Sequence, residues 1–185
     1  MNKAFEIKLY DDDPPIVSMG LDLSTSATGV CIVTTDGQGG VKILHHETIG
    51  YKADPKLKTL TKSGKSKTLT RAQLADRLLY ISNRIVGLAI NFGVNRVARE
   101  GYAYGKNSRS VSVLAELGGV VAVDLFRRVE LPMIHLTVGQ CRKFTVEKGY
   151  GDKKRAIKAM KKLGLQFDTD DEYDAYAVEI GRAHV

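Results

Sequence analysis

Hydrophobic and polar residues alternate along this chain with two different periods, which together predict a mixed α/β fold. Short apolar runs bounded by glycine, aspartate or proline are typical of strands, because successive strand side chains point to opposite faces. The predicted strands cover about residues 16–23, 28–35, 41–50, 94–100 and 133–137. The glycine-rich turn at 36–40 separates the second strand from the third, so the first three strands are expected to form an antiparallel meander.

Longer segments repeat apolar residues every three to four positions, which is the spacing of one buried helix face. The first begins after Thr68 or Thr70, either of which is a suitable N-cap. Its buried face is predicted to carry Leu74, Leu78, Ile81, Ile85 and Leu88. Further helices are predicted at about 108–129, 138–147, 152–163 and 170–182, with Pro132 ending the segment before the last strand.

The length of 185 residues suits one domain with a sizeable core. Residues 1–15 are polar, without a signal-peptide core, and are expected to form an N-terminal tail before a single domain at 16–185. The Lys-, Ser- and Gly-rich segment 51–67 is interpreted as a flexible basic loop within that domain. No apolar run of about 18 residues or more occurs, which argues against a membrane span.

Two cysteines, Cys31 and Cys141, stand alone within apolar or helical patterns and lack metal-ligand spacing to any histidine. They are expected to be reduced and structural. The expected compartment is the cytoplasm, or the nucleoid or organelle compartment that holds DNA, rather than a secreted location.

The formal net charge of +7 is concentrated in two basic stretches. The first contains Lys52, Lys56, Lys58, Lys62, Lys65, Lys67 and Arg71, and the second contains Arg142, Lys143, Lys148, Lys153, Lys154, Arg155, Lys158, Lys161 and Lys162. Such clusters suit an anionic polymer, because neutralising phosphates releases counterions. A pair of solvated basic faces is the alternative. The candidate catalytic residues of this chain are acidic, and acidic catalytic residues in a basic chain favour nucleic acid as the partner.

Four carboxylates are the candidate catalytic residues. Asp22 and Glu100 each end a predicted strand, whereas Asp171 and Asp174 share one face of the last helix at a spacing of i,i+3. Hard divalent cations such as Mg²⁺ or Mn²⁺ take oxygen ligands of this kind, and two ions about 3.5–4 Å apart can promote phosphodiester hydrolysis. Asp170 is an alternative partner for Asp174 at i,i+4. Helix capping and ordinary surface charge remain the structural alternative for the pair.

The segment around Asp22 is ambiguous when taken alone. Small and hydroxyl residues from Gly20 to Gly29 let the chain turn tightly after an acidic strand, so that a phosphate or a metal can approach. This pattern also resembles the first phosphate loop of the actin and sugar-kinase superfamily. That reading requires a second lobe, for which the chain is too short. A hairpin with a satisfied surface aspartate is the third possibility.

Residues after Glu100 carry a more specific resemblance. The stretch Gly101-Tyr102-Ala103-Tyr104-Gly105-Lys106-Asn107-Ser108 is similar to the aromatic-containing loop that follows the fourth strand in the RuvC family of Holliday-junction resolvases, within the RNase H-like superfamily. Further matches follow in the same order. They are the small-residue helix at 115–122, Pro132 before the last strand, Gly149-Tyr150-Gly151-Asp152-Lys153-Lys154, and the terminal Asp171-Glu172-Tyr173-Asp174-Ala175.

The resemblance covers about residues 16–182 and implies an RNase H-like fold, with a five-stranded mixed sheet and helices on both faces. It implies that the four carboxylates bind two metal ions and that Lys153 steadies negative charge near the scissile phosphate. It also implies a homodimer that nicks four-way DNA junctions symmetrically. The small residues Gly118, Gly119 and Ala122 would let helices approach at the dimer interface, or would equally serve packing within the domain.

The residues expected to contact DNA are Tyr102, Tyr104, Lys106, Asn107, Arg109, Lys62, Lys65, Lys67 and Lys154. Tyr102 and Tyr104 flank Ala103, so neither cleanly matches the family's base-stacking aromatic. Arg99 is a second departure, because an apolar residue is usual in a strand covered on both faces. No histidine is assigned to the metal site. Cleavage of RNA–DNA hybrid, and junction binding without cleavage, are the alternative functions.

Overall fold

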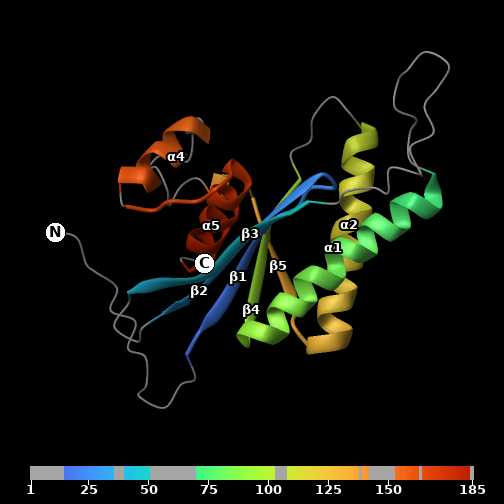
Figure 1. The fold of residues 1–185 in the computed structure, drawn as a ribbon, viewed down its shortest axis with the longest axis horizontal. Coiled ribbons are helices and arrows are strands. Elements are labelled where there is room, and N and C mark those ends of the chain that lie inside the picture. The colour runs from blue at the N-terminus through green and yellow to red at the C-terminus, as the bar shows by residue number, and fades with distance from the viewer. Residues whose placement is uncertain are drawn as a thin grey trace.

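The computed structural model describes residues 15–35, 40–50, 70–102, 108–137, 139–141, 153–162 and 164–183. Their strands form one five-stranded sheet in the order β3-β2-β1-β4-β5 (Figure 1). The strands are β1 (Val17–Asp22), β2 (Ala27–Thr35), β3 (Val41–Gly50), β4 (Arg96–Glu100) and β5 (Met133–Leu136). β1, β2 and β3 are antiparallel, whereas β1, β4 and β5 run parallel. The predicted mixed sheet with its meander is therefore confirmed.

Helices cover both faces of this sheet. α1 (Arg71–Phe92) and α2 (Ser108–Val129) lie on one face, α5 (Asp170–Ala183) lies on the other, and α4 (Lys153–Lys162) lies beyond α5 (Figure 1). Thr70 caps α1, because its side chain accepts a hydrogen bond from the Gln73 backbone while the Gln73 side chain accepts one from Thr70. Of the helix predicted at 138–147, residues 139–141 are helical and most of the rest lies outside the described residues.

The main core lies between the sheet and α1 and α2. Alternate strand residues point into it, as the period of two requires, and the longest side chains there are fully buried. This set consists of Met19, Leu21, Val30, Ile32, Val97, Ile81, Ile85, Leu117 and Leu125. The predicted face of α1 is confirmed, with Leu78, Ile81, Ile85 and Leu88 buried and Leu74 half-buried at its edge. This face therefore supplies most of the hydrophobic stabilisation.

The opposite face of the sheet is built from small residues, so that α5 approaches the strands closely. A Cβ atom placed on Gly20 of β1 would lie 2.1 Å from the Ala175 carbonyl oxygen and 3.1 Å from the Glu179 nitrogen. Backbone thus rests directly on backbone. Cys31 and Cys141 are buried thiols on this side of the sheet, in agreement with their expected structural role. Within the described residues, no helix has the length and apolar character needed to cross a membrane.

Gly20→Ala should strongly destabilise the protein, because the added methyl group meets the α5 backbone, which cannot rotate away as a side chain can. Overpacking of this kind costs about 1–3 kcal/mol. In a chain of this size that corresponds to a fall in melting temperature of roughly 2–12 °C. The matched control is Gly50→Ala in β3, where a Cβ has no neighbour within 4 Å among the residues that the structure describes. Equal melting temperatures for the two variants would show that α5 does not rest on Gly20.

Candidate active site

Two of the predicted carboxylates lie side by side at the carboxyl ends of neighbouring parallel strands. β1 and β4 pair in parallel with Leu21 opposite Arg99, so the next residue in each strand is Asp22 and Glu100. Gly20 contacts α5 and Ala98 packs against Val178 of α5, which identifies the strand positions that face this helix. Because side chains alternate, Asp22 and Glu100 fall on the same α5-facing side of the sheet. Both are half-buried.

α5 brings the remaining two carboxylates to this edge. Asp22 pairs in register with Gly29 of β2, and a Cβ on Gly29 would lie 2.0 Å from the Asp171 carbonyl oxygen and 3.1 Å from the Asp171 Cβ. The backbone of Asp171 therefore lies against the residue opposite Asp22. Asp174 follows one turn later on the same face of α5. Both are half-buried, whereas Asp170 is exposed, which favours Asp171 over Asp170 as the partner of Asp174.

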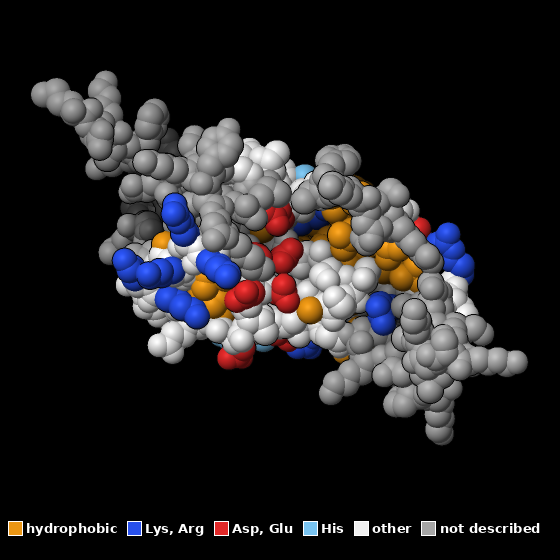
Figure 2. Space-filling view, turned by 90° about the horizontal axis from the view of Figure 1, so that it is seen from above, with side chains coloured by type: hydrophobic (Ala, Val, Ile, Leu, Met, Phe, Trp, Pro, Cys, Tyr) orange, Lys and Arg blue, Asp and Glu red, His pale blue; other side chains and the backbone are white. Residues whose placement is uncertain are grey.

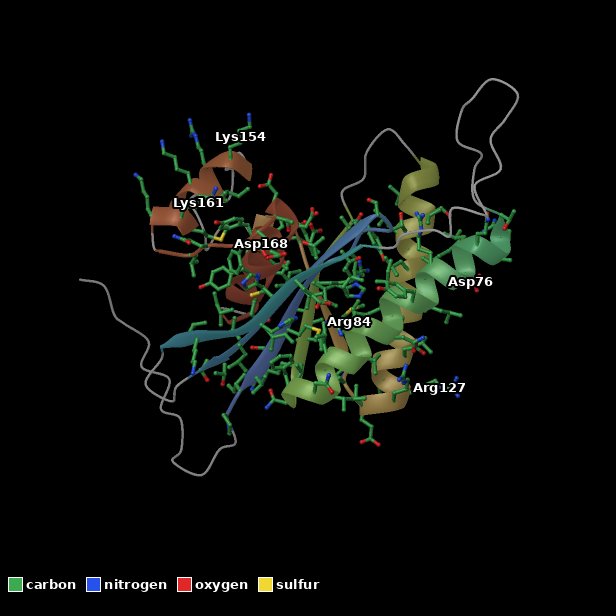
Figure 3. All side chains as sticks on the ribbon, in the orientation of Figure 1. Asp76, Arg84, Arg127, Lys154, Lys161 and Asp168 are labelled. Atoms are coloured by element: carbon green, nitrogen blue, oxygen red, sulfur yellow. The ribbon has the colours of Figure 1, made fainter. Side chains whose placement is uncertain are left out.

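The surface around this edge combines both signs of charge. Figure 2 shows acidic side chains gathered near the middle of the face, with lysine and arginine side chains to one side. α4 supplies exposed basic residues there, namely Lys154, Arg155, Lys158, Lys161 and Lys162. Lys154 lies on the side of the molecule at which β1 and β4 end (Figure 3). Anionic substrate would thus meet positive charge beside the carboxylates.

The donor set fits a divalent cation. Asp22, Glu100, Asp171 and Asp174 offer carboxylate oxygens only, which are the ligands that Mg²⁺ and Mn²⁺ prefer. They come from two strands and a helix that are packed backbone to backbone, so the ligands are held by rigid elements rather than by a loop. Half-burial of the four carboxylates would leave a bound cation accessible to substrate.

A second polar cluster, which the sequence did not indicate, fastens the start of α5 to β3. The carboxylate of Glu172 is buried, with one oxygen 2.6 Å from the His46 Nδ1 atom and the other accepting a hydrogen bond from the Thr48 hydroxyl at 2.9 Å. The backbone N–H of Asp168 also donates to it. Ligand atoms of His46, Asp168 and Glu172 lie within 4.8 Å of one another. Since both Glu172 oxygens already accept hydrogen bonds, we interpret the cluster as a structural fastener beside Asp171.

Arg99 is buried on the opposite, α2-facing side of β4. Its guanidinium carbon lies 4.1 Å from the centre of the Tyr102 ring, and its Nη2 atom is 3.3 Å from the His135 Nδ1 atom. Burial lowers the pKa of Arg99 and raises the pKa of Tyr102, the latter opposed by the nearby guanidinium. The pKa of His135 is lowered by burial and by Arg99, so a neutral ring is favoured there. The sequence analysis did not explain a charged residue at this strand position. The contact of the guanidinium with the face of the Tyr102 ring explains how the charge is accommodated.

Other predicted residues divide into those the structure places and those it does not. Tyr102 is half-buried and donates a hydrogen bond from its hydroxyl to the Leu114 carbonyl of α2 at 2.8 Å. Gly118 is buried beneath that hydroxyl, so it serves packing within the domain, whereas Gly119 is exposed with open space around it. Outside the described residues lie Tyr104, Lys106, Asn107, Lys62, Lys65, Lys67 and the side chains of Arg109 and Lys153.

Comparison with known proteins agrees with this architecture. A curated relative from Syntrophomonas wolfei, the crossover junction endodeoxyribonuclease RuvC, is 28% identical over 171 residues, spanning 90% of this chain and 87% of the relative. Thermus thermophilus RuvC in complex with Holliday junction substrate superposes with a TM-score of 0.72 at 19% identity, covering 91% of this chain and 93% of that one. The yeast mitochondrial Holliday junction resolvase Ydc2 superposes with a TM-score of 0.61 at 12% identity, covering 91% and 78%.

At such identities the solved structures establish the shared fold, which is the RNase H-like fold that the sequence predicted. A family model decides the family, because the model for crossover junction endodeoxyribonuclease RuvC matches residues 53–182, more than half of the chain. This match includes three of the four candidate carboxylates, namely Glu100, Asp171 and Asp174. The chain therefore belongs to the RuvC family.

Proposed function

We propose that this protein is a metal-dependent endodeoxyribonuclease that resolves four-way DNA junctions by symmetric nicking. The observation that carries the proposal is the convergence of Asp22, Glu100 and Asp171 on one edge of the sheet in a chain of this family. A relative of the same fold has been captured with Holliday junction substrate. A basic helix, α4, lies beside that edge, where it would attract the DNA backbone.

In this mechanism Asp22, Glu100, Asp171 and Asp174 would hold two divalent cations, Mg²⁺ or Mn²⁺. When bound, such ions lower the pKa of a water molecule and neutralise charge on the attacking and leaving oxygens. Water is the nucleophile, so no covalent link to the protein forms. The rigid packing of α5 against Gly29 fixes the ligand positions before substrate arrives. Lys153, at the first position of α4, is assigned to stabilise negative charge that develops on the phosphate.

DNA contact is assigned to basic and aromatic residues around the site. These are Tyr104, Lys106, Asn107 and Arg109 after β4, Lys62, Lys65 and Lys67 in the basic segment, and Lys154 on α4. Lysine and arginine side chains would bind phosphates without reading sequence, whereas Tyr104 would stack on an exposed base. Tyr102 was predicted to share that stacking role, but its hydroxyl is engaged with α2.

Asp171→Asn should lower the rate of junction cleavage at least about 100-fold, because it removes a metal-ligand charge with little change in shape. Asp174→Asn should do the same. The matched control is Asp170→Asn, since Asp170 is adjacent but exposed, and its rate should stay within about threefold of the wild type.

Synthetic four-way junction, linear duplex and RNA–DNA hybrid, each with Mg²⁺ or Mn²⁺, are the substrates for this measurement. Symmetric nicks in the junction alone support the proposal. Cleavage of hybrid would place the protein among RNase H-type enzymes, and tight junction binding without any cut would make it a binding protein. Loss of activity in Asp170→Asn with full activity in Asp171→Asn would reassign the helix ligand.

Divalent metal should stabilise the fold, because the clustered carboxylates repel one another without a cation. At a free ion concentration about 100 times the dissociation constant, binding contributes about 2.7 kcal/mol, or roughly 5–10 °C in melting temperature. Asp174→Asn should melt at the same temperature as wild type or higher without metal, and should show a smaller rise with Mg²⁺. Monovalent salt at matched ionic strength is the control, and an equal rise in that salt would exclude a specific site.

Symmetric nicking requires two active sites, so we also propose a homodimer with its contact on α2. This helix exposes Val123 and Phe126, and the open space at Gly119 permits close approach of a second helix. Phe126→Glu should yield a monomer by sedimentation at micromolar concentration. Ile90→Glu on α1 removes an equally prominent apolar side chain and should leave the dimer intact. A monomeric wild-type protein would refute this arrangement.

A further inference from the structure

The chain that leaves β4 is tied down on both sides of Glu100. Before it, the Arg99 Nη1 group donates a hydrogen bond to the Glu100 carbonyl oxygen at 3.4 Å. After it, the Gly101 N–H donates to the Leu136 carbonyl of β5 at 2.6 Å. Next, the Tyr102 hydroxyl donates to the Leu114 carbonyl of α2 at 2.8 Å. The backbone that carries the Glu100 carboxylate is thus held by β5 and by α2 within two residues.

Arg99 and Tyr102 also hold each other. Arg99 is only 4% exposed, and its guanidinium lies over the Tyr102 ring at 4.1 Å. Its Nη2 atom reaches the His135 ring, while its buried Nε has no hydrogen-bond partner among the described residues. Within the part of the chain that the structure describes, the contacts of this guanidinium include no carboxylate, and the ring face, the Glu100 carbonyl and the imidazole only partly offset the cost of burying it. Such an arrangement is expected where position matters more than stability.

α2 is shaped to receive this pair. A Cβ on Gly118 would lie 2.0 Å from the Tyr102 hydroxyl oxygen, 3.3 Å from the Tyr102 Cζ and 3.4 Å from the Arg99 Cζ. Glycine destabilises the interior of a helix relative to alanine, so its presence here has a packing reason. At the neighbouring Gly119, no atom of the described part of the chain lies within 4 Å of such a Cβ. Of these two glycines, therefore, only Gly118 makes room for the Arg99–Tyr102 pair.

We propose that Arg99 and Tyr102, seated on Gly118, are positioning residues for Glu100. They set the direction in which its carboxylate enters the metal site without touching substrate or metal themselves. Displacement of a catalytic group by about 1 Å can cost about 100-fold in rate, so a clamp on this ligand has a direct consequence for cleavage. The inference rests on the proposed function, because it assigns a role to Glu100 within that site.

Tyr102→Phe separates positioning from base stacking. The variant keeps the ring and its contact with Arg99 but loses the hydrogen bond to Leu114. Positioning predicts a cleavage rate at saturating enzyme that is about 10-fold lower, with a higher half-saturating Mg²⁺ concentration. The dissociation constant for junction, measured without divalent metal, should change less than about twofold. A wild-type rate and Mg²⁺ requirement would overturn the proposal.

Gly118→Ala provides an independent test through a double-mutant cycle. Alone, it should lower the rate and raise the Mg²⁺ requirement, since the methyl group displaces the tyrosine hydroxyl. In the Tyr102→Phe background the 2.0 Å contact with the hydroxyl is gone and the nearest ring atom is at 3.3 Å, a tight contact that a small shift relieves, so the same change should have a smaller further effect. Gly87→Ala in α1, where a Cβ meets no described residue within 4 Å, controls for the gain in helix propensity. Simple multiplication of the two rate losses would contradict a shared mechanism.

Failure of this inference is distinguishable from failure of the proposed function. Wild-type protein that cuts no DNA would refute the function, and the rise in melting temperature with Mg²⁺ then tests positioning directly. A smaller rise in Tyr102→Phe than in wild type supports it, and equal rises overturn it. Full activity in Tyr102→Phe with weakened junction binding in Tyr102→Ala also overturns it, and assigns Tyr102 to stacking.

Discussion

Direct contact between the backbone of α5 and the sheet is the constraint on which the rest of this structure depends. Side chains normally keep a helix away from the sheet it covers, but Gly20 and Gly29 leave none at the crossing, and the Ala175 and Asp171 carbonyls occupy the space. Asp171 and Asp174 belong to this helix. The contact between α5 and the sheet therefore also sets how far these two carboxylates lie from β1. Stability and site geometry are thus coupled.

The two faces of the sheet contribute differently to stability and to the candidate site. Large apolar residues between the sheet and α1 and α2 supply most of the driving force for folding, since the hydrophobic free energy scales with the apolar area that is buried. The α5 face buries smaller residues and ends in the carboxylates that we propose as metal ligands, which would repel one another when no cation is present. A protein can carry such a destabilising edge only when another face stabilises the fold. The fastener at Glu172, which joins α5 to His46 and Thr48 of β3, helps hold the helix against that repulsion.

Arg99 is a charged residue in a strand that is covered on both faces, where an apolar residue is usual, and its local contacts explain the exception. Its neighbours Val97 and Ala98 are buried and apolar, as expected of a strand covered on both faces. The arginine lies one residue before Glu100, on the opposite side of the strand, and its charge is accommodated by the ring of Tyr102 and by His135. Deviations of this kind are expected near functional sites, where position is maintained at a cost in stability.

The sequence by itself determined the elements, the mixed sheet and the candidate carboxylates. Apolar periodicity predicted every described strand to within two residues, and Thr70 was one of the two expected N-caps, because local spacing and capping chemistry decide these features. Only the tertiary structure decided which residues meet. The choice between Asp170 and Asp171 depends on exposure, the role of Gly118 depends on Tyr102 reaching α2, and the contact of His46 with Glu172 joins residues 126 positions apart. The local sequence does not predict such contacts. They depend on how the helices and strands pack together, and hydrophobic periodicity does not give the relative orientation of these elements.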